Sequence, residues 1–202
     1  MLGMSRAIMC QFIVIVYSRS SQISFPFHHF FCRTWLLRKL YVQAVGQICS
    51  TASMAHNLKQ CRQLVAKAAS AGAKVSNPND NCSSQPFITL IQALFLPEAS
   101  DYIGFSAAET VSLAKSVQES EFVLGLQDEA RKSKLHINVG IHEPAEGGQK
   151  VKNTLIWIDE RGDIVQRYQK LHLFDVEIKG GPILKESQFV LCVFRFSQFT
   201  ED

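Results

Sequence analysis

The chain has 202 residues, of which 47% are hydrophobic, and it carries a formal net charge of +3 at pH 7. This length and composition are sufficient for one domain with a sizeable core, and they exclude an intrinsically disordered chain. A net charge this small does not by itself indicate nucleic acid, a membrane surface or an acidic ligand as the partner.

Residues 1–40 differ in character from the rest of the chain. No Asp or Glu precedes Asp80, whereas nine Lys or Arg residues do, and Ser is frequent among the first residues. This composition is typical of a mitochondrial transit segment. The apolar stretch at residues 8–17 is about ten residues long and is interrupted by Gln11. It is shorter than the roughly 20 residues needed to span a bilayer.

Other interpretations of residues 1–40 remain open. The length of the apolar stretch fits a secretory signal, although no convincing small-residue cleavage site follows it. A basic nucleic-acid-binding arm is disfavoured because Ile, Val and Phe are interleaved with the basic residues. We expect a disordered or irregular extension, with or without a targeting role, on a cytoplasmic or mitochondrial protein that binds neither membrane nor nucleic acid.

The cysteines give no sign of a metal site. They are widely spaced, without a C-x-x-C pair or a Cys/His group at ligand spacing. We therefore expect reduced thiols in an intracellular protein, and no metal. The six cysteines are Cys10, Cys32, Cys49, Cys61, Cys82 and Cys192.

The first expected elements are a strand at residues 42–48 and a helix at residues 57–70 that ends before Gly72. A parallel strand should follow directly. Instead, residues 75–92 form a turn-rich polar run with an apolar tail, which is longer than the usual connection in such a unit. Two explanations remain open. The first is that the segment is a translated, unspliced intron, because it begins with Val, whose codons begin with GT, and ends with Gln, which CAG can encode. The second is that it is a genuine surface loop.

The short apolar run at residues 93–96 is closed by Pro97, which indicates a buried strand that delivers Glu98 into a loop. Proteins of the α/β class place reacting groups at such strand ends. We expect the Glu98 carboxylate to be partly desolvated and suited to proton transfer, the alternative being a solvated loop residue.

The remaining pattern predicts a mixed α/β order. Ser106 and Glu109 form a capping box that opens a helix to about residue 117, and a second helix covers residues 120–132. Residues 135–141 alternate as a strand. Residues 153–158 and 164–168 form a hairpin with Gly162 at its turn.

Several of these segments resemble, in order, the first half of a carbon-nitrogen hydrolase of the nitrilase superfamily. They are Leu-Pro-Glu at 96–98, Gly-Ile-His-Glu at 140–143, Asn-Thr-Leu at 153–155 and Lys-Leu-His-Leu-Phe-Asp at 170–175. Residues 96–103 and 175–178 are most similar to the Nit-type amidases of deaminated glutathione. The resemblance covers residues 42–187 except for the interruption.

The resemblance implies an α-β-β-α sandwich, here truncated to its first half, and a Glu-Lys-Cys triad that hydrolyses a small carboxyamide without metal or organic cofactor. Glu98 matches the general base and Lys170 the cation that stabilises the oxyanion. Amide hydrolysis needs a carboxylate and a lysine of this kind. The carboxylate accepts the proton of the nucleophile, and the fixed positive charge stabilises the negative charge that develops on the carbonyl oxygen. His172 and Asp175 are expected to hold the lysine loop.

The nucleophilic cysteine of the triad is expected to be absent. Cys192 is followed by Arg195 at three residues where the family has four, and the Tyr-Asp and Pro-Glu of the family motif are missing. Cys49 and Cys61 belong to the first strand's exit and the first helix. We therefore expect this chain to be inactive.

The predicted domains are an extension at 1–40, a partial hydrolase domain at 41–187 with the irregular insertion at 75–92, and a tail at 188–202 outside the family pattern, which could also be intron read-through. Half a sandwich leaves one sheet face uncovered, so we expect a poorly soluble or oligomeric chain. The alternative to an amidase is a non-catalytic fragment that pairs with a full-length subunit. Nucleic-acid binding through the basic N-terminus is a third hypothesis.

Overall fold

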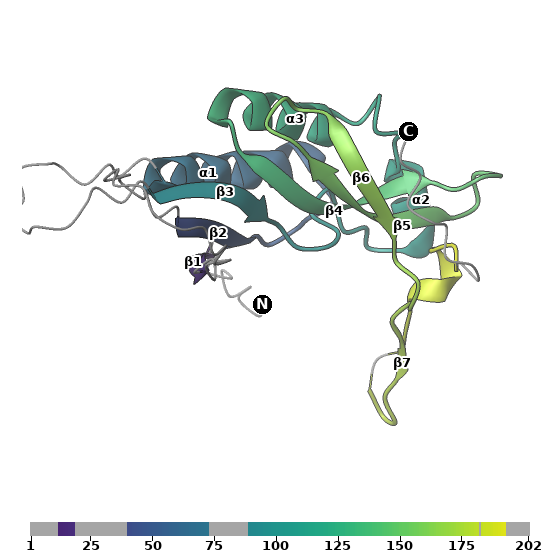
Figure 1. Ribbon diagram of the computed structural model, residues 1–202. Helices are drawn as coiled ribbons and strands as arrows, with labels where there is room; N and C mark the ends of the chain where they lie inside the picture. Colours follow the sequence, from purple (N-terminus) through teal and green to yellow (C-terminus); the bar gives the residue numbers. More distant parts are fainter. Residues whose placement is uncertain (1–11, 19–39, 73–88, 182, 193–202) are drawn as a thin grey trace, which may run out of the picture.

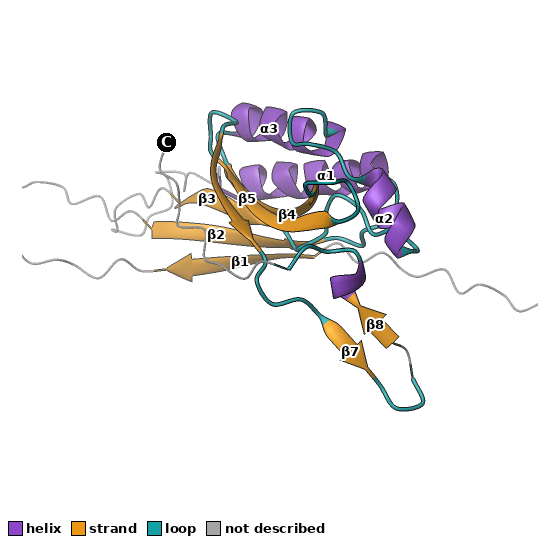
Figure 2. Ribbon diagram, turned by 90° about the vertical axis from the view of Figure 1, so that its right-hand side faces the viewer, coloured by secondary structure: helices purple, strands orange, loops and turns teal. Residues whose placement is uncertain are grey.

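The computed structural model describes residues 12–18, 40–72, 89–181 and 183–192 (Figure 1). A six-stranded mixed sheet has the order β1-β2-β3-β4-β5-β6, and β7 pairs with β8 separately. Helices α1 and α3 lie side by side on one face of the large sheet (Figure 2). The expected mixed α/β class is confirmed.

The elements are β1 (Phe12–Ser18), β2 (Leu40–Gln47), α1 (Met54–Gly72), β3 (Thr89–Phe95), α2 (Ala107–Leu113), α3 (Glu121–Ser133), β4 (His136–Pro144), β5 (Val151–Ile158), β6 (Ile164–Gln169), β7 (Asp175–Glu177), β8 (Ile183–Lys185) and the 3-10 turn η1 (Glu186–Gln188).

Strand β1 corrects the expectation for part of the N-terminal extension. Phe12–Ser18 pairs antiparallel with β2, with Val14 opposite Val45. The segment is rich in β-branched and aromatic residues, which favour strands once a neighbouring strand offers its edge. The expected irregular structure is therefore wrong for these seven residues, and the rest of 1–40, apart from Leu40, lies outside the described residues.

The core lies between α1, α3 and the sheet. The apolar face expected on the first helix is confirmed, although α1 begins three residues earlier than predicted, at Met54 rather than Asn57. The two helices approach closely at Gly125 of α3, where an added Cβ would lie 2.6 Å from Leu58 Cδ2 of α1. The buried residues of the α1 face are Leu58, Cys61, Leu64, Val65 and Ala68.

Strand β3 begins inside the segment that was expected to be irregular. Thr89 to Gln92 belong to β3, which runs parallel to β2, so the prediction of irregular structure up to residue 92 was too long by these four residues. Leu90 and Ile91 are apolar, and the segment extends β3 along β2, because the described pairs between β3 and β4 begin only at Ala93. The register shifts between Ile91 and Ala93, which leaves Gln92 as the extra residue of a β-bulge. Residues 75–88 lie outside the described residues.

Both expected helix starts are confirmed by their caps. Ser106 accepts a hydrogen bond from Glu109 N, and the Glu109 carboxylate accepts one from Phe105 N. Ser120 caps α3 in the same way. Helix α2 ends at Leu113 rather than near 117, because the chain turns to place Ser120 at the start of α3, with Ser120 N donating to the carbonyl of residue 116.

The strand expected at residues 135–141 is confirmed as β4, although it is buried on both faces and not on alternate residues. Helices cover one face (Figure 2), and the loop that follows β3 lies against Gly140, where Ser100 N donates to Gly140 O. The hairpin β5–β6 is confirmed, with Gly162 in the left-handed region at φ +83°. Glu98 thus lies in the loop that follows β3, next to the buried strand β4 and its neighbour β5.

Candidate active site

Two loops far apart in the sequence meet at Glu98 and Lys170. Glu98 follows β3 and Lys170 follows β6, and Lys170 Nζ lies 3.2 Å from Glu98 Oε1. The backbone fixes the start of the lysine loop, because Lys170 N donates to Asn153 O of β5. The structure therefore brings together the two residues that the sequence singled out.

A third charged residue, Glu186, completes the cluster and was missed by the sequence analysis. Lys170 Nζ lies 3.0 Å from Glu186 Oε2 and 3.3 Å from Oε1. Glu186 also accepts hydrogen bonds from Asn153 Nδ2 and from the backbone N of Phe174. It stands in η1, and no spacing motif marks it. The one signal that could have led to Glu186 was the general need of a half-buried lysine, here Lys170, for a second anionic partner.

The ion pair between Lys170 and Glu186 is held in its charged form. Burial alone would lower the pKa of Lys170, but hydrogen bonds and charge from Glu186 and Glu98 outweigh it and raise the pKa above its usual value. Burial alone would raise the pKa of Glu186, but hydrogen bonds from Phe174 N, Asn153 and Lys170 outweigh it and lower the pKa. The ammonium is thus a stable positive charge at neutral pH.

Glu98 is more exposed than expected. Its side chain is 61% exposed, whereas that of Glu186 is only 10% exposed. The expectation of a partly desolvated Glu98 carboxylate was therefore wrong. The chain leaves the sheet at Pro97 and turns at Ala99, which has a left-handed φ of 52°, so the side chain emerges at the surface.

A pocket of about 270 Å³ lies beside this cluster. Glu98 and Glu186 line it, and Lys170, although not itself among the lining residues, hydrogen-bonds to both. Its lining combines apolar and polar residues, as in many small-molecule sites. The apolar lining residues include Ile103, Phe174, Leu184 and Phe189, and the polar ones include Thr110, His142, Asn153 and Lys185.

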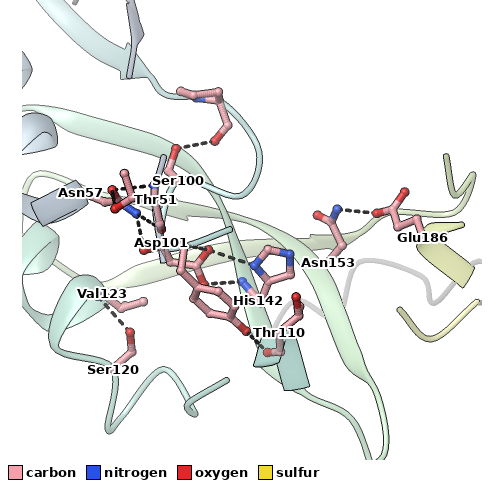
Figure 3. A network of polar contacts seen from close by, with 12 residues as sticks. Thr51, Asn57, Ser100, Asp101, Thr110, Ser120, Val123, His142, Asn153 and Glu186 are labelled. Atoms are coloured by element: carbon pink, nitrogen blue, oxygen red, sulfur yellow. Dashed lines mark hydrogen bonds and ion pairs between the residues drawn. The ribbon is translucent and has the colours of Figure 1, made fainter. Parts of the chain in front are cut away.

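Asp101 and His142 form a buried pair next to the pocket (Figure 3). His142 Nδ1 lies 3.0 Å from Asp101 Oδ1, and His142 N donates to Asp101 Oδ2 at 2.7 Å. Tyr102 packs against the imidazole with a ring-centroid distance of 4.8 Å. The sequence analysis noted His142 only as part of a motif and gave it no role, because its partner Asp101 is 41 residues away.

The described residues place no cysteine in the pocket lining. Cys49 and Cys192 are exposed and Cys61 is buried in the core. Cys10, Cys32 and Cys82 lie outside the described residues. In the lysine loop, Asp175 accepts a hydrogen bond from Ser187 N, whereas His172 is exposed.

The described residues show neither a metal-binding cluster nor a membrane-spanning helix. No three or more His, Cys, Asp or Glu side chains among them gather in a way that could hold a metal ion. None of the helices in the described part of the chain is both long enough and apolar enough to cross a membrane.

A family model for carbon-nitrogen hydrolases matches residues 80–191. The chain belongs to the carbon-nitrogen hydrolase family. The matched range includes residues 188–191, which the sequence analysis placed in a tail outside the family. In the structure Val190 of this segment is fully buried and forms a bridge with Val151 of β5, so the segment packs with the domain.

Relatives and solved structures agree with this family. The chain is 36% identical over 149 residues to the probable hydrolase nit2 of Schizosaccharomyces pombe, which covers 73% of this chain and 48% of that protein. It is 32% identical over 156 residues to the deaminated glutathione amidase of Mus musculus, which covers 75% of this chain and 42% of that protein. The NitFhit crystal structure from C. elegans aligns with a TM-score of 0.59 at 27% identity, over 75% of this chain and 32% of that one.

The chain thus spans less than half the length of these curated relatives. The nitrilase superfamily member Nit3 of Saccharomyces cerevisiae aligns with a TM-score of 0.51 at 19% identity, over 72% of this chain and 45% of that one. That likeness supports the nitrilase-type fold.

Proposed function

We propose that this chain carries the base and the cation of an amidase site that acts on a small carboxyamide such as deaminated glutathione. The observation that carries the proposal is the 3.2 Å contact between Lys170 Nζ and Glu98 Oε1 beside the pocket. During attack on an amide carbonyl, the carboxylate can accept the proton that the nucleophile loses. An ammonium at this separation can stabilise the negative charge that develops on the carbonyl oxygen.

In the proposed reaction Glu98 accepts the proton of a thiol nucleophile while sulfur bonds to the amide carbon. Lys170 stabilises the oxyanion that forms on the carbonyl oxygen. Glu98 then returns the proton to the nitrogen as the C–N bond breaks, and the amine leaves, or ammonia where the amide is primary. Water, activated by Glu98, hydrolyses the thioester. Glu186 keeps Lys170 charged and in place through its two contacts with Nζ.

The lining of the pocket supports a small acidic amide as substrate. Lys185 lines the pocket and is exposed, so it can meet a carboxylate at the far end of the ligand. Deaminated glutathione carries such carboxylates. Two relatives suggest it as the first compound to test, the deaminated glutathione amidases of mouse and of rat.

Binding tests the site independently of turnover. We expect deaminated glutathione to bind the purified chain in isothermal titration calorimetry and to lose about tenfold or more of its affinity in Lys170→Met, which removes the positive charge. Lys179→Met is the matched control, because Lys179 is exposed and does not line the pocket. Equal affinity in both variants, or no binding to the unaltered chain, would contradict the proposal.

We further propose that this chain alone does not turn the amide over, because no cysteine in the described part of the chain lines the site. The proposal rests on the absence of Cys49, Cys61 and Cys192 from the pocket lining among the described residues. The rate at which the amide bond of deaminated glutathione is hydrolysed, followed as release of the amine part of the molecule, should therefore equal the protein-free rate. Turnover that disappears in Cys192→Ala would overturn this part of the proposal and leave the amidase assignment standing.

The domain boundaries stay a proposal. We propose that residues 1–40 are an extension to the hydrolase domain and that an insertion lies between α1 and β3. Sequencing the mature transcript tests whether the insertion is a retained intron. A transcript that contains these codons, together with peptides covering residues 77–91, would show a genuine segment instead.

A second candidate function is a non-catalytic subunit that pairs with a full-length amidase. The exposed apolar residues of β6, β8 and the turn before β8 favour it, because such residues gather at protein interfaces. Coexpression with a full-length homologue and light scattering after size exclusion tests it: a mixed complex is expected, and separate elution would exclude this candidate. The exposed residues are Val165, Tyr168, Ile178, Ile183 and Leu184.

A further inference from the structure

One face of the large sheet carries a row of uncharged side chains, one from each strand from β2 to β6. Each is paired with the next across neighbouring strands, and residues paired in this way point to the same face of a sheet. Leu94 and Ile137, which adjoin the row in β3 and β4, belong to the core beneath α1 and α3, so the row lies on the opposite face. The row consists of Val45, Phe95, Asn138, Trp157 and Gln166.

The whole of this face is uncharged in the described part of β2 to β6. The alternation of side chains places apolar residues, Gln, Asn and His on it, and no Asp, Glu, Lys or Arg. The charged residues of these strands are Glu143, Lys152 and Arg167, and they alternate onto the other face, where Arg167 pairs with Glu143. The absence of charge is therefore a property of one face and not of the strands.

This uncharged face is apolar and accessible. The rings of Phe95 and Trp157, which lie two strands apart, meet at a centroid distance of 5.6 Å, and Val45 is 44% exposed. The helices that pack on the sheet, α1 and α3, lie on the other face (Figure 2). Strands β2, β3 and β4 run parallel, and parallel strands occur almost only in sheets that are covered on both faces. The face thus has the character of an interface.

The β7–β8 hairpin stands on the same side of the sheet. Figures 1 and 2 both show it projecting away from α1 and α3. Ile178, Ile183 and Leu184 of this hairpin are each more than half exposed. A sheet face six strands wide and roughly five residues deep presents on the order of 500 Å². Together with the hairpin it approaches the ~800 Å² per partner of a standard protein interface.

We propose that a second copy of this chain covers the uncharged face, with the two sheets packed face to face across a twofold axis and the helices outside. A twofold interface sets the same surface of both copies against itself, so charges of one sign would meet and repel. A face without charge avoids this cost, and it offers no contact to a partner that is recognised by its charge. The inference does not depend on the proposed amidase function, because none of the row residues lines the pocket.

Sedimentation velocity of the full chain tests the proposal. We expect the mass to rise from monomer to dimer between about 1 μM and about 100 μM, because the interface is at the small end of the size range. Val45→Lys places a positive charge in both halves of the interface and should weaken the dimer about tenfold or more. Leu124→Lys is the matched control, because Leu124 is also 44% exposed but lies on α3. It should leave the dimer unchanged.

A mixing experiment distinguishes a second copy from any other occupant. Val45→Glu alone should weaken the dimer as Val45→Lys does, whereas an equal mixture of the two variants should restore it, because opposite charges then meet across the axis. Restoration is expected only where two substituted faces share one contact. Failure of the mixture to associate more tightly than either variant alone would overturn the twofold arrangement.

Tryptophan emission gives a readout without a charged substitution, should the charged variants not fold. Trp157 is the only tryptophan of a Trp35→Phe chain. Its emission should move to shorter wavelengths over the concentrations at which the mass doubles, because the partner sheet excludes water from the row.

Three further outcomes overturn the proposal. They are a monomer at every concentration, a dimer that Val45→Lys weakens no more than Leu124→Lys, and Trp157 emission that stays constant while a dimer forms. Association with a full-length homologue but not with a second copy would assign the face to that homologue instead.

Discussion

Gly140 of β4 lies directly against the backbone of Glu98. A Cβ added at Gly140 would lie 2.4 Å from Glu98 Cα, closer than any real Cβ contact. Two backbone hydrogen bonds fasten the same loop, from Gly140 N to Pro97 O and from Ser100 N to Gly140 O. The position of the proposed base thus depends on a residue without a side chain.

We expect Gly140→Ala to displace the Glu98 loop and to destabilise the chain by about 1–3 kcal/mol, because the obstructing atoms are backbone atoms that cannot move aside. Urea denaturation measures the free energy of unfolding. Gly181→Ala is the control, since its Cβ would meet mainly the Ile178 side chain, which is exposed and can shift. Equal stability of the two variants would show that the contact at Glu98 is not tight.

Lys170→Met should destabilise the fold as well as the site. It leaves the Glu186 carboxylate, whose side chain is only 10% exposed, without its cationic partner. We expect a loss of about 1–3 kcal/mol in the free energy of unfolding, most of it from Glu186, because Glu98 is 61% exposed and its pair contributes little. A loss no larger than that of Lys179→Met in the same urea titration would contradict this.

Glu186→Gln should change how stability depends on pH. The pKa of Glu186 is lowered in the folded state, chiefly by hydrogen bonds that outweigh burial. A group whose folded pKa is depressed adds stability above its unfolded pKa, and this stability disappears as the pH falls through the folded pKa. The variant should be less stable than the unaltered chain at pH 7, and the difference should shrink below about pH 4.

Thermal unfolding followed by circular dichroism between pH 3 and pH 8 measures this difference. Glu160→Gln provides the control, because Glu160 is exposed in the β5–β6 hairpin. A gap between Glu186→Gln and the unaltered chain that stays constant across this range would rule out the proposed linkage.

Cys61 should resist alkylation in the folded chain. It is fully buried, and burial, with a smaller contribution from the charge of Asp101, raises its pKa to about 12. Only about one thiol in ten thousand is then ionised at pH 8, and the thiolate is the reactive form. Peptide mass spectrometry after iodoacetamide treatment should find Cys49 and Cys192 modified and Cys61 intact, with all three modified in urea. Rapid modification of Cys61 without urea would show that α1 opens easily.

Local signals predicted the helices well. Ser106 and Ser120 precede amphipathic runs, and the cap of a helix depends only on residues within one turn, so the sequence contains the whole cause. The strand at Phe12–Ser18 was missed because its stability comes from pairing with β2, which no local pattern reports.

The site was predicted in part, for a similar reason. Glu98 and Lys170 stand at the ends of recognisable strands within motifs, so their meeting could be expected. Glu186 and Asp101 act through contacts with residues 16 and 41 positions away, and neither sits in a spaced pattern. Their roles follow from tertiary packing alone.

The bulge at Gln92 has a consequence for how this domain tolerates change in length. Side chains along a strand alternate between the two faces, so one added residue would normally turn every later side chain over. At Gln92 the extra residue is absorbed locally, and Leu94 remains fully buried. The alternation of side chains between the two faces of β3 therefore starts again just before Ala93. One extra residue upstream of this point is therefore accommodated without reversing the part of β3 that leads to the proposed base.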